Sequence, residues 1–396
     1  MKYKFLFSLL FSLILGGMVA TQAVADDYAC QVNTLIGTKG TGLTSGYLYP
    51  GATYPYGMVQ FTPSYFSKRS GFVINQLSGG GCEHMGNFPT FPVKGKLKMS
   101  PDNILNYRIN ISEEKGHAGY YEAMVQEDIK AKLTVTERTG MASYEYPADQ
   151  QYGTIIIGGG ISATPIEQAA IVITAPNKCE GYAEGGNFCG LRTPYKVYFV
   201  AEFDTDALET GTWKREELMP NTTFAEGEYS GVYFTFDVNK KKNIQYKIGV
   251  SYVSVENARE NLKAENTEWD FQKIQNQAEA KWNHYLGMIE VEGTNPDRTT
   301  QFYTHLYRSF IHPNVCSDVN GEYMGADFRV HKSRSKHYTS FSNWDTYRTQ
   351  IQLLSMLDPE VASDIVISHQ LFAEQSGGSF PRWVMANIET GEIGRA

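Results

Sequence analysis

The chain has 396 residues, 42% apolar and 20% charged, an ordinary composition for a globular protein and a length sufficient for two or more domains. Its net charge of −8, without any run of basic residues, argues against nucleic acid and against anionic membrane surfaces as partners. Aromatic residues make up 13%, which suits both carbohydrate-binding surfaces and the cores of β-sandwiches.

The first 25 residues have the pattern of an export signal. Lys2 and Lys4 precede the apolar run 5–15, and the small residues Ala23 and Ala25 offer a cleavage site. The run is too short to span a bilayer comfortably, and basic residues do not follow it. We therefore expect a signal peptide at residues 1–25, a periplasmic or extracellular protein, and no membrane attachment after removal of the signal.

Residues 30–63, rich in Gly, Thr, Tyr and Pro, predict loops between short strands. The glycine-rich stretch 78–89 follows, with Glu83 and His84 beside Cys82. Binding residues gather on such loops, so both are candidate ligand contacts. The alternative, more common for isolated polar residues, is that they are solvated loop side chains.

Five cysteines in an exported chain leave at least one unpaired in a monomer. Cys179 and Cys189 bracket the polar, glycine-rich segment 180–188, and we predict a disulfide between them. Closing so short a loop would contribute somewhat under about 3 kcal/mol of stability. None of the cysteines has the spacing of zinc ligands.

The middle of the chain predicts strands that alternate with turns. Alternating and β-branched residues recur at 131–136, 152–157, 197–203, 231–238 and 246–253, with Gly, Asn and Asp between them. No helical pattern of credible length interrupts this part. The simplest interpretation is an antiparallel β-sandwich at residues 26–256.

Helical periodicity begins at Asn257. Residues 258–264 and 281–286 have the pattern of charged amphipathic helices, which we assign to a linker at 257–296. Further helices are predicted at residues 299–310, 346–357 and 361–375. Residues 297–396 therefore look like the start of an all-α domain.

Residues 341–348 place Trp344, Asp345 and Arg348 close together before an apolar helical run. Such a group suits a sugar, because an indole stacks on a pyranose while a carboxylate and a guanidinium bind its hydroxyls. The alternative is a helix N-terminus capped by Ser342 or Asn343, with Asp345 paired to Arg348 three residues later. The stretch alone favours the second interpretation.

Several motifs in order give the chain a strong resemblance to glycoside hydrolase family 92. They extend over nearly all of the chain after the signal and are VNTLIGT (32–38), PGATYPYGMV (50–59), FYTHLYR (302–308), HP (312–313), SDVNGEY (317–323), SNWDTYR (342–348) and GGSFPRW (377–383).

The resemblance implies a calcium-dependent exo-α-mannosidase that inverts the anomeric centre of mannose-containing glycans. The implied architecture is an N-terminal β-sandwich, linker helices and an (α/α)6 barrel, with the site between the two domains. Carried over to this sequence, Trp344, Asp345 and Arg348 hold the terminal mannose, and Glu83 and His84 belong to the neighbouring loop. The main chain of Asn33 approaches the calcium.

Two departures qualify the resemblance. The loop after Cys82 departs from the commoner family form, in which acidic residues follow the cysteine, and Glu83, His84 and Asn87 in their place leave the linkage preference open. The family's general acid, general base and main calcium ligands come from later barrel helices, expected beyond Ala396. We therefore assign no catalytic residue and expect the chain alone to be inactive, as a truncated or fragmentary mannosidase. The alternative is a non-catalytic, carbohydrate-binding β-sandwich product.

Overall fold

A computed structural model describes residues 27–39, 46–64, 71–102 and 110–390. The predicted signal peptide at residues 1–25 lies outside these ranges. Among the described residues, no helix combines the length and apolar character needed to cross a membrane.

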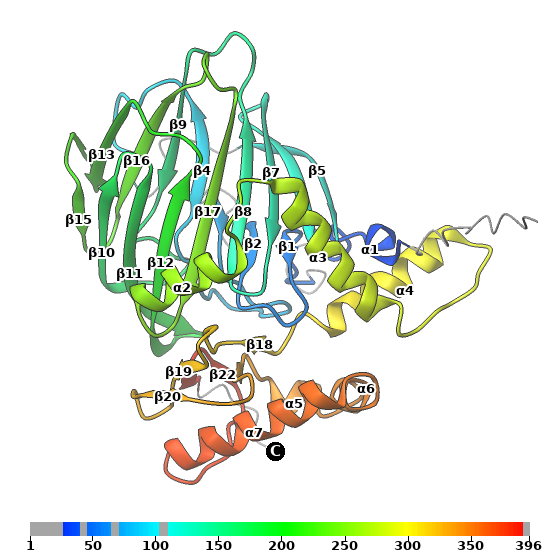
Figure 1. Cartoon of the computed structure of the whole chain (residues 1–396). Coiled ribbons are helices and arrows are strands. Elements are labelled where there is room, and N and C mark those ends of the chain that lie inside the picture. Colours follow the sequence, from blue (N-terminus) through cyan, green and yellow to red (C-terminus); the bar gives the residue numbers. More distant parts are fainter. Residues whose placement is uncertain (1–26, 40–45, 65–70, 103–109, 391–396) are drawn as a thin grey trace, which may run out of the picture.

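Two antiparallel sheets pack face to face and form the N-terminal half (Figure 1). The first sheet has eight strands in the spatial order β1 (Ala52–Thr53), β2 (Gln60–Pro63), β3 (Phe72–Val73), β4 (Thr90–Lys94), β9 (Tyr152–Ile157), β16 (Ser230–Asp237), β13 (Glu209–Lys214) and β14 (Glu217–Pro220). The second has nine in the order β15 (Phe224–Glu226), β10 (Ile166–Ala175), β11 (Lys178–Phe188), β12 (Leu191–Phe203), β17 (Asn243–Ser251), β8 (Thr139–Glu145), β7 (Ile129–Val135), β6 (Tyr120–Val125) and β5 (Ile111–His117). The predicted antiparallel sandwich is confirmed.

Side-chain alternation explains how these sequences form a sandwich. In β6, buried and half-buried residues alternate, so one face enters the core and the other approaches solvent. The central strand β9 is apolar on both faces and is buried from Gly153 to Ile157. Aromatic side chains such as Phe203 and Tyr246, with ring centroids 5.3 Å apart, fill the space between the sheets.

The predicted disulfide between Cys179 and Cys189 is wrong. Segment 180–188 is not a loop, because it lies in β11, an extended strand that pairs with both β10 and β12. Its ends are about 33 Å apart at the rise of an extended strand, whereas bridged Cα atoms lie within about 7 Å. Gly181 has a structural reason to be glycine, since a Cβ there would lie 2.2 Å from the carbonyl oxygen of Ala170.

Helix α1 (Tyr28–Gln31) comes before the sandwich in the chain, whereas α2 (Val255–Glu265), α3 (Phe271–Leu286) and α4 (Pro296–Ser309) connect the sandwich to the C-terminal part. Ser254, Asp270 and Asn295 cap the last three by accepting hydrogen bonds from backbone N–H groups of the first turn. The buried Trp282 attaches α3 to the sandwich, because its indole N–H donates to the carbonyl of Thr53 at 2.7 Å.

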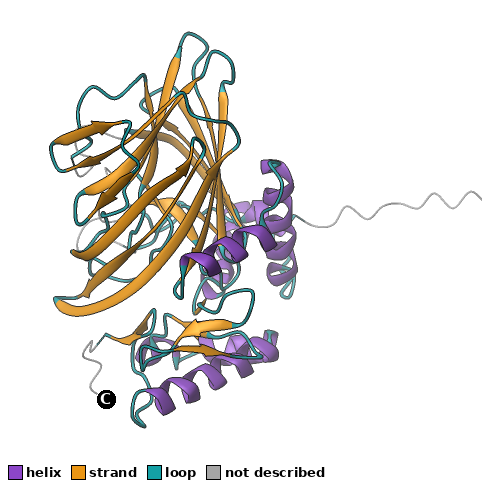
Figure 2. Ribbon diagram, turned by 60° about the vertical axis from the view of Figure 1, so that its left-hand side comes forward, coloured by secondary structure: helices purple, strands orange, loops and turns teal. Residues whose placement is uncertain are grey.

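The C-terminal part forms a smaller layer beside one end of the sandwich (Figure 2). It contains α5 (Asn343–Thr346), α6 (Gln350–Leu357) and α7 (Pro359–Gln375), with the short strands β18 (Asn314–Val315), β19 (Glu322–Met324), β20 (Val330–Lys332), β21 (Tyr338–Thr339), β22 (Val384–Met385) and β23 (Ile388–Glu389). The helix predicted at 346–357 is interrupted before Gln350, where Thr349 has a φ of 67°. Within residues 27–390, these helices do not close into a barrel.

Buried polar groups fix the C-terminal part against the sandwich. The carboxylate of Asp318, just before β19, accepts hydrogen bonds from Asn261 at 2.6 Å, Ser251 at 2.7 Å and Asn257 at 2.8 Å. Burial raises the pKa of this carboxyl. The loop before β19 is therefore attached to both β17 and α2. These hydrogen bonds fix the start of the C-terminal part against the sandwich.

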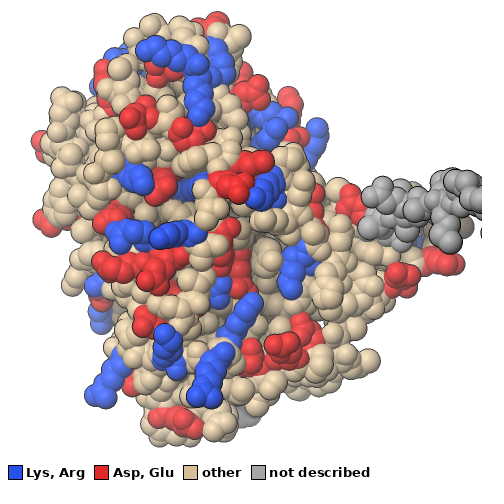
Figure 3. Space-filling view, viewed as in Figure 1, with Lys and Arg blue, Asp and Glu red and all other residues tan. Residues whose placement is uncertain are grey.

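Acidic and basic side chains are interspersed on the face of the molecule shown in Figure 3. Partly exposed ion pairs in the molecule include Lys178 with Glu202 at 2.9 Å and Arg259 with Glu180 at 2.6 Å. Such pairs contribute little to stability, and their mixed signs give this face no extended basic surface.

Candidate functional site

A pocket of about 430 Å³ lies where the sandwich meets the C-terminal part. Its volume is in the range of small-molecule sites. The sandwich contributes residues 77–81 and Phe188, the connecting helix α4 contributes Arg308, and the C-terminal part contributes His312, Ser340, Ser342, Trp344, Asp345, Thr346, Gln350 and Trp383.

Two of the predicted substrate-binding residues, Trp344 and Asp345, line this pocket together. Both stand on the short helix α5, and the Trp344 side chain is 48% exposed, so its ring is open to a ligand. Arg348 is not among the lining residues, and its guanidinium lies 5.1 Å from the ring centroid of Tyr347.

The contacts of α5 agree only in part with the alternative in which residues 342–348 form a capped helix N-terminus without a role in binding. Ser342 is the N-cap residue, yet its side chain makes no capping hydrogen bond, and its hydroxyl instead donates to the Asp345 carboxylate. The ion pairs of the described residues do not include Asp345 with Arg348. Neither the cap nor the ion pair explains Asp345, whose carboxylate remains exposed at the pocket.

Two histidines, the buried His84 and the partly buried His312, hold the glycine-rich loop at the pocket wall. The Nε2 atom of His84 accepts the N–H of Leu77 at 2.9 Å, and its Nδ1–H donates to the Cys82 carbonyl at 2.6 Å. His312, from the C-terminal part, accepts the N–H of Ser78 at 2.8 Å and donates to Asn314 at 2.7 Å. The imidazole of His84 is thus buried within its own loop and is not among the lining residues.

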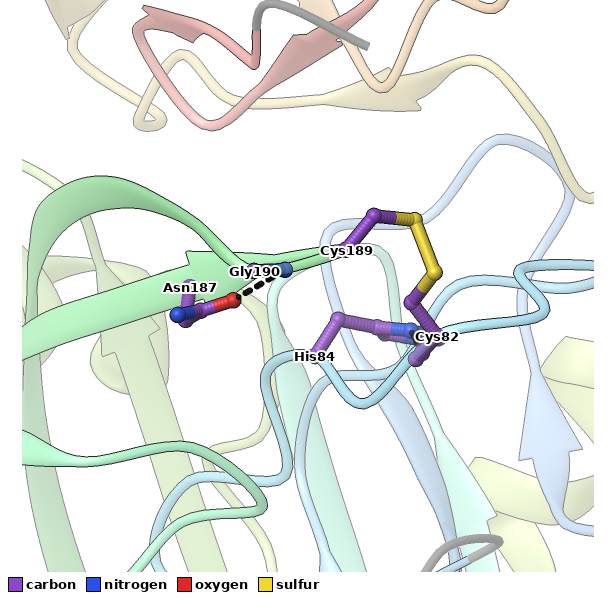
Figure 4. Close-up of a disulfide and its surroundings, with 5 residues drawn as sticks. All are labelled: Cys82, His84, Asn187, Cys189 and Gly190. Carbon is purple, nitrogen blue, oxygen red and sulfur yellow. Dashed lines mark hydrogen bonds between the residues drawn. A yellow bond between two sulfur atoms is a disulfide. The ribbon is translucent and has the colours of Figure 1, made fainter.

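The disulfide of this chain joins Cys82 to Cys189, with Cα atoms 5.1 Å apart (Figure 4). It attaches the glycine-rich loop to the turn after β11, where the N–H of Gly190 donates to Asn187 at 2.9 Å. Glu83 lies in a separate hollow of about 290 Å³ beside this disulfide, not in the main pocket. The structure therefore separates Glu83 from Trp344 and Asp345.

The main chain of Asn33, predicted to approach calcium, makes hydrogen bonds within the fold. Its N–H donates to Thr304 at 3.0 Å, its carbonyl accepts the N–H of Ile36 at 3.2 Å, and its side chain accepts the N–H of Leu35. Calcium takes six to eight oxygen ligands. Among the described residues, no group of three or more His, Cys, Asp or Glu side chains is arranged to hold a metal, so these residues alone do not fit a calcium site.

The buried histidines predict a loss of stability in weak acid. Burial lowers the pKa of His84 and of His312 to about 4 from an ordinary value near 6.5. Their folded-state pKa lies below the unfolded one, so the unfolded chain binds more protons below pH 6.5. The stability is fully present above that pH and is lost as the pH falls toward 4.

We expect the free energy of unfolding to fall by about 1.5 kcal/mol for each of these two histidines between pH 6.5 and 5. Urea unfolding at half-unit pH steps measures this slope. A His84→Gln variant, which has one titrating group fewer, should show a shallower slope. A wild-type free energy that stays flat over this range would contradict the prediction.

Sequence analysis did not single out several pocket residues. Arg308 and His312 stand in motifs that carry the family resemblance, so that signal was present. The guanidinium of Arg308 donates to the carbonyl of Thr34 at 2.7 Å and connects α4 to the turn that follows Asn33. No local pattern marks Phe188, which enters the pocket only because the turn after β11 carries it there.

Comparison with known proteins gives matches over most of the chain. Residues 31–251 match the glycosyl hydrolase family 92 N-terminal domain, and residues 257–394 match the family 92 catalytic domain. An uncharacterized secreted glycosidase of Arthroderma benhamiae is 26% identical over 86% of this chain and 48% of its own length.

Solved structures agree with these matches. A family GH92 alpha-mannosidase of Bacteroides thetaiotaomicron, also solved in complex with mannoimidazole, has a TM-score of 0.84 and 26% identity over 93% of this chain. A family GH92 inverting mannosidase of the same organism has a TM-score of 0.77 and 25% identity over 90%. The chain spans about half the length of these relatives, 52% and 50%. With the first domain match alone covering more than half of its residues, the chain belongs to glycosyl hydrolase family 92.

Proposed function

We propose that this chain supplies the mannose-binding part of a secreted exo-α-mannosidase that depends on calcium, inverts the anomeric centre and acts on mannose-rich glycans. Trp344 and Asp345 bind the terminal mannose, and Arg348 provides a cation beside them. Glu83 and His84 belong to the loop at the opposite side, where His84 acts by holding the loop. The observation that carries the proposal is the pocket shared by an exposed tryptophan, a carboxylate and glycine-rich backbone.

The chemistry of the pocket supports a sugar as its ligand. The indole of Trp344 offers a flat apolar surface for the C–H face of a pyranose. The Asp345 carboxylate accepts hydrogen bonds from hydroxyl groups, and it is exposed enough to do so. Backbone at Gly79 and Gly80 allows a ligand to approach closely, because no side chain stands in front of it.

The relatives support a mannose-containing ligand and an exported protein. The Bacteroides alpha-mannosidase that was solved in complex with mannoimidazole is 26% identical to this chain. The fungal relative is named as a secreted glycosidase, in keeping with the export signal expected at residues 1–25.

The residues described here do not supply the chemistry of hydrolysis by themselves. Inversion uses a general acid and a general base whose carboxyl groups are about 6.5 to 9.5 Å apart, with water between the base and the sugar. Asp345 is the single carboxylate among the described pocket-lining residues, so no pair is present there. We assign Asp345 to binding and place the acid, the base and the main calcium ligands in the half of the relatives that this chain does not span.

We expect Asp345→Asn to weaken binding of methyl α-mannoside by about 10- to 150-fold, the equivalent of losing a charged hydrogen bond of about 1.5 to 3 kcal/mol. Trp344→Ala should also lose affinity, because the stacking surface is gone. Isothermal titration or saturation-transfer NMR with the 396-residue chain measures both. Trp269→Ala and Asp128→Asn are matched controls, since neither residue lines the pocket.

If Asp345→Asn binds methyl α-mannoside as tightly as the wild type does, Asp345 has only a structural role at the start of α5. In a longer chain that completes the barrel, the same substitution should lower kcat/KM by a similar factor. A longer chain that binds mannosides but releases no mannose from an aryl α-mannoside would instead favour a non-catalytic carbohydrate-binding protein.

A further inference from the structure

The wall of the pocket on the sandwich side is built from backbone that has little stiffness of its own. Three consecutive glycines, Gly79 to Gly81, line the pocket. Glycine loses more conformational freedom on folding than any other residue, so such a segment must be held by its surroundings. Gly80 also has no room for a side chain, because a Cβ would lie 2.8 Å from Cε1 of His84.

Hydrogen bonds hold the N-terminal side of this wall. The N–H groups of Leu77, Ser78 and Gly79 donate in turn to His84 at 2.9 Å, to His312 at 2.8 Å and to the carbonyl of Tyr47 at 2.9 Å. Two of these three successive amides are thus bound to residues outside the loop, His312 and Tyr47, and the third is bound to His84 of the loop itself.

A covalent bond holds the C-terminal side. Cys82 follows the third glycine directly, and its disulfide partner Cys189 follows Phe188 (Figure 4). Phe188 lines the pocket and packs against Trp383 of the C-terminal part, with ring centroids 4.7 Å apart. The cross-link therefore joins two lining segments of the sandwich at the point where one of them contacts the C-terminal part.

We propose that the Cys82–Cys189 disulfide and the imidazole of His84 are positioning groups for the sugar pocket. They hold Gly79–Gly81 and Phe188 at fixed distances from Trp344 and Asp345, so that mannoside affinity depends on the cross-link. None of these groups needs to touch the sugar. The inference rests on the proposed function for the ligand, but the rigidity of the loop can be measured without one.

The first experiment measures hydrogen exchange in the 396-residue chain by mass spectrometry. In Cys189→Ser, the amides of Leu77, Ser78 and Gly79 should exchange at least about tenfold faster than in the oxidised wild type. Cys179→Ser is the matched control, because Cys179 is a free, buried cysteine on the same hairpin and does not line the pocket. Exchange that is equal in both variants and the wild type would overturn the proposal.

The second experiment measures the dissociation constant for methyl α-mannoside below the unfolding temperature of each variant. We expect Cys189→Ser, and wild type reduced with a phosphine, to bind about tenfold more weakly, while Cys179→Ser binds like the wild type. His84→Gln should bind better than His84→Ala, since an amide replaces part of the imidazole hydrogen bonding.

The possible outcomes separate the two proposals. If oxidised wild type does not bind mannosides, the proposed function fails, and the exchange experiment alone decides whether the disulfide holds the loop. If wild type binds and Cys189→Ser binds equally well with a loosened loop, the pocket does not depend on the cross-link. If affinity falls equally in Cys179→Ser, general destabilisation is the cause. Either of the last two results overturns the positioning role.

Discussion

Replacement of Cys189 by Ser should lower the free energy of unfolding by up to about 4.7 kcal/mol, the chain-entropy value for a loop of roughly 100 residues. Cys82 and Cys189 are 107 positions apart, so their bond closes a long loop in the unfolded chain. The local pairing predicted from the sequence would have given somewhat less than about 3 kcal/mol. The size of the loss therefore reports which cysteines are paired.

Urea unfolding of oxidised wild type, reduced wild type and Cys189→Ser measures this loss. The last two should agree, because both lack the same bond. Reduction should leave Cys189→Ser unchanged, which shows that no other disulfide contributes. A difference between oxidised and reduced wild type below about 3 kcal/mol would contradict the prediction, since the local pairing would give a loss of that size.

Asp318→Ala should destabilise the fold by about 3 to 5 kcal/mol, because it leaves three buried donors without their acceptor. Those donors are the side chains of Ser251, Asn257 and Asn261, which come from β17 and α2. An unsatisfied buried polar group costs about 1 to 3 kcal/mol, and three donors lose the same acceptor at once. The amides of Asn261 and Asn257 each keep one other hydrogen bond, to the Val250 carbonyl at 2.8 Å and to Glu322 at 3.0 Å.

The melting temperature and the urea midpoint of Asp318→Ala test this expectation. Asp128→Ala is a suitable control, since the Asp128 side chain is 46% exposed and its single ion pair with Lys94 is on the surface. The control should lie within about 0.5 kcal/mol of wild type. If the two variants are equally stable, Asp318 does not join the C-terminal part to the sandwich in the way described.

Side-chain periodicity was sufficient to predict the sandwich, because long alternating or β-branched runs such as β9 and β16 leave few alternatives. It failed at β11, where Gly181, Gly185 and Gly186 give the sequence of a loop. These glycines serve close approach between strands, since Cβ atoms at Gly181 and Gly185 would lie within 2.5 Å of backbone oxygens. Tertiary packing outweighed local propensity there.

The pocket could be predicted only in part. Trp344 and Asp345 are adjacent in sequence, so their shared location follows from the motif itself. Phe188 and Trp383 are far apart in the chain, and only the folded sandwich brings them together. The position of His84 also could not be predicted from the sequence. Its imidazole was predicted to contact a ligand, but it lies buried beneath Gly80.

The extended conformation of β11 has a consequence for oxidative folding. In the unfolded chain, loop-closure entropy favours a bond between Cys179 and Cys189 over one between Cys189 and the distant Cys82. Once β11 pairs with its neighbours, the first bond is geometrically excluded, and Cys179 becomes a buried thiol whose pKa is raised by desolvation. We expect this burial to slow thiolate exchange at Cys179, so that strand pairing favours the native disulfide over the local one.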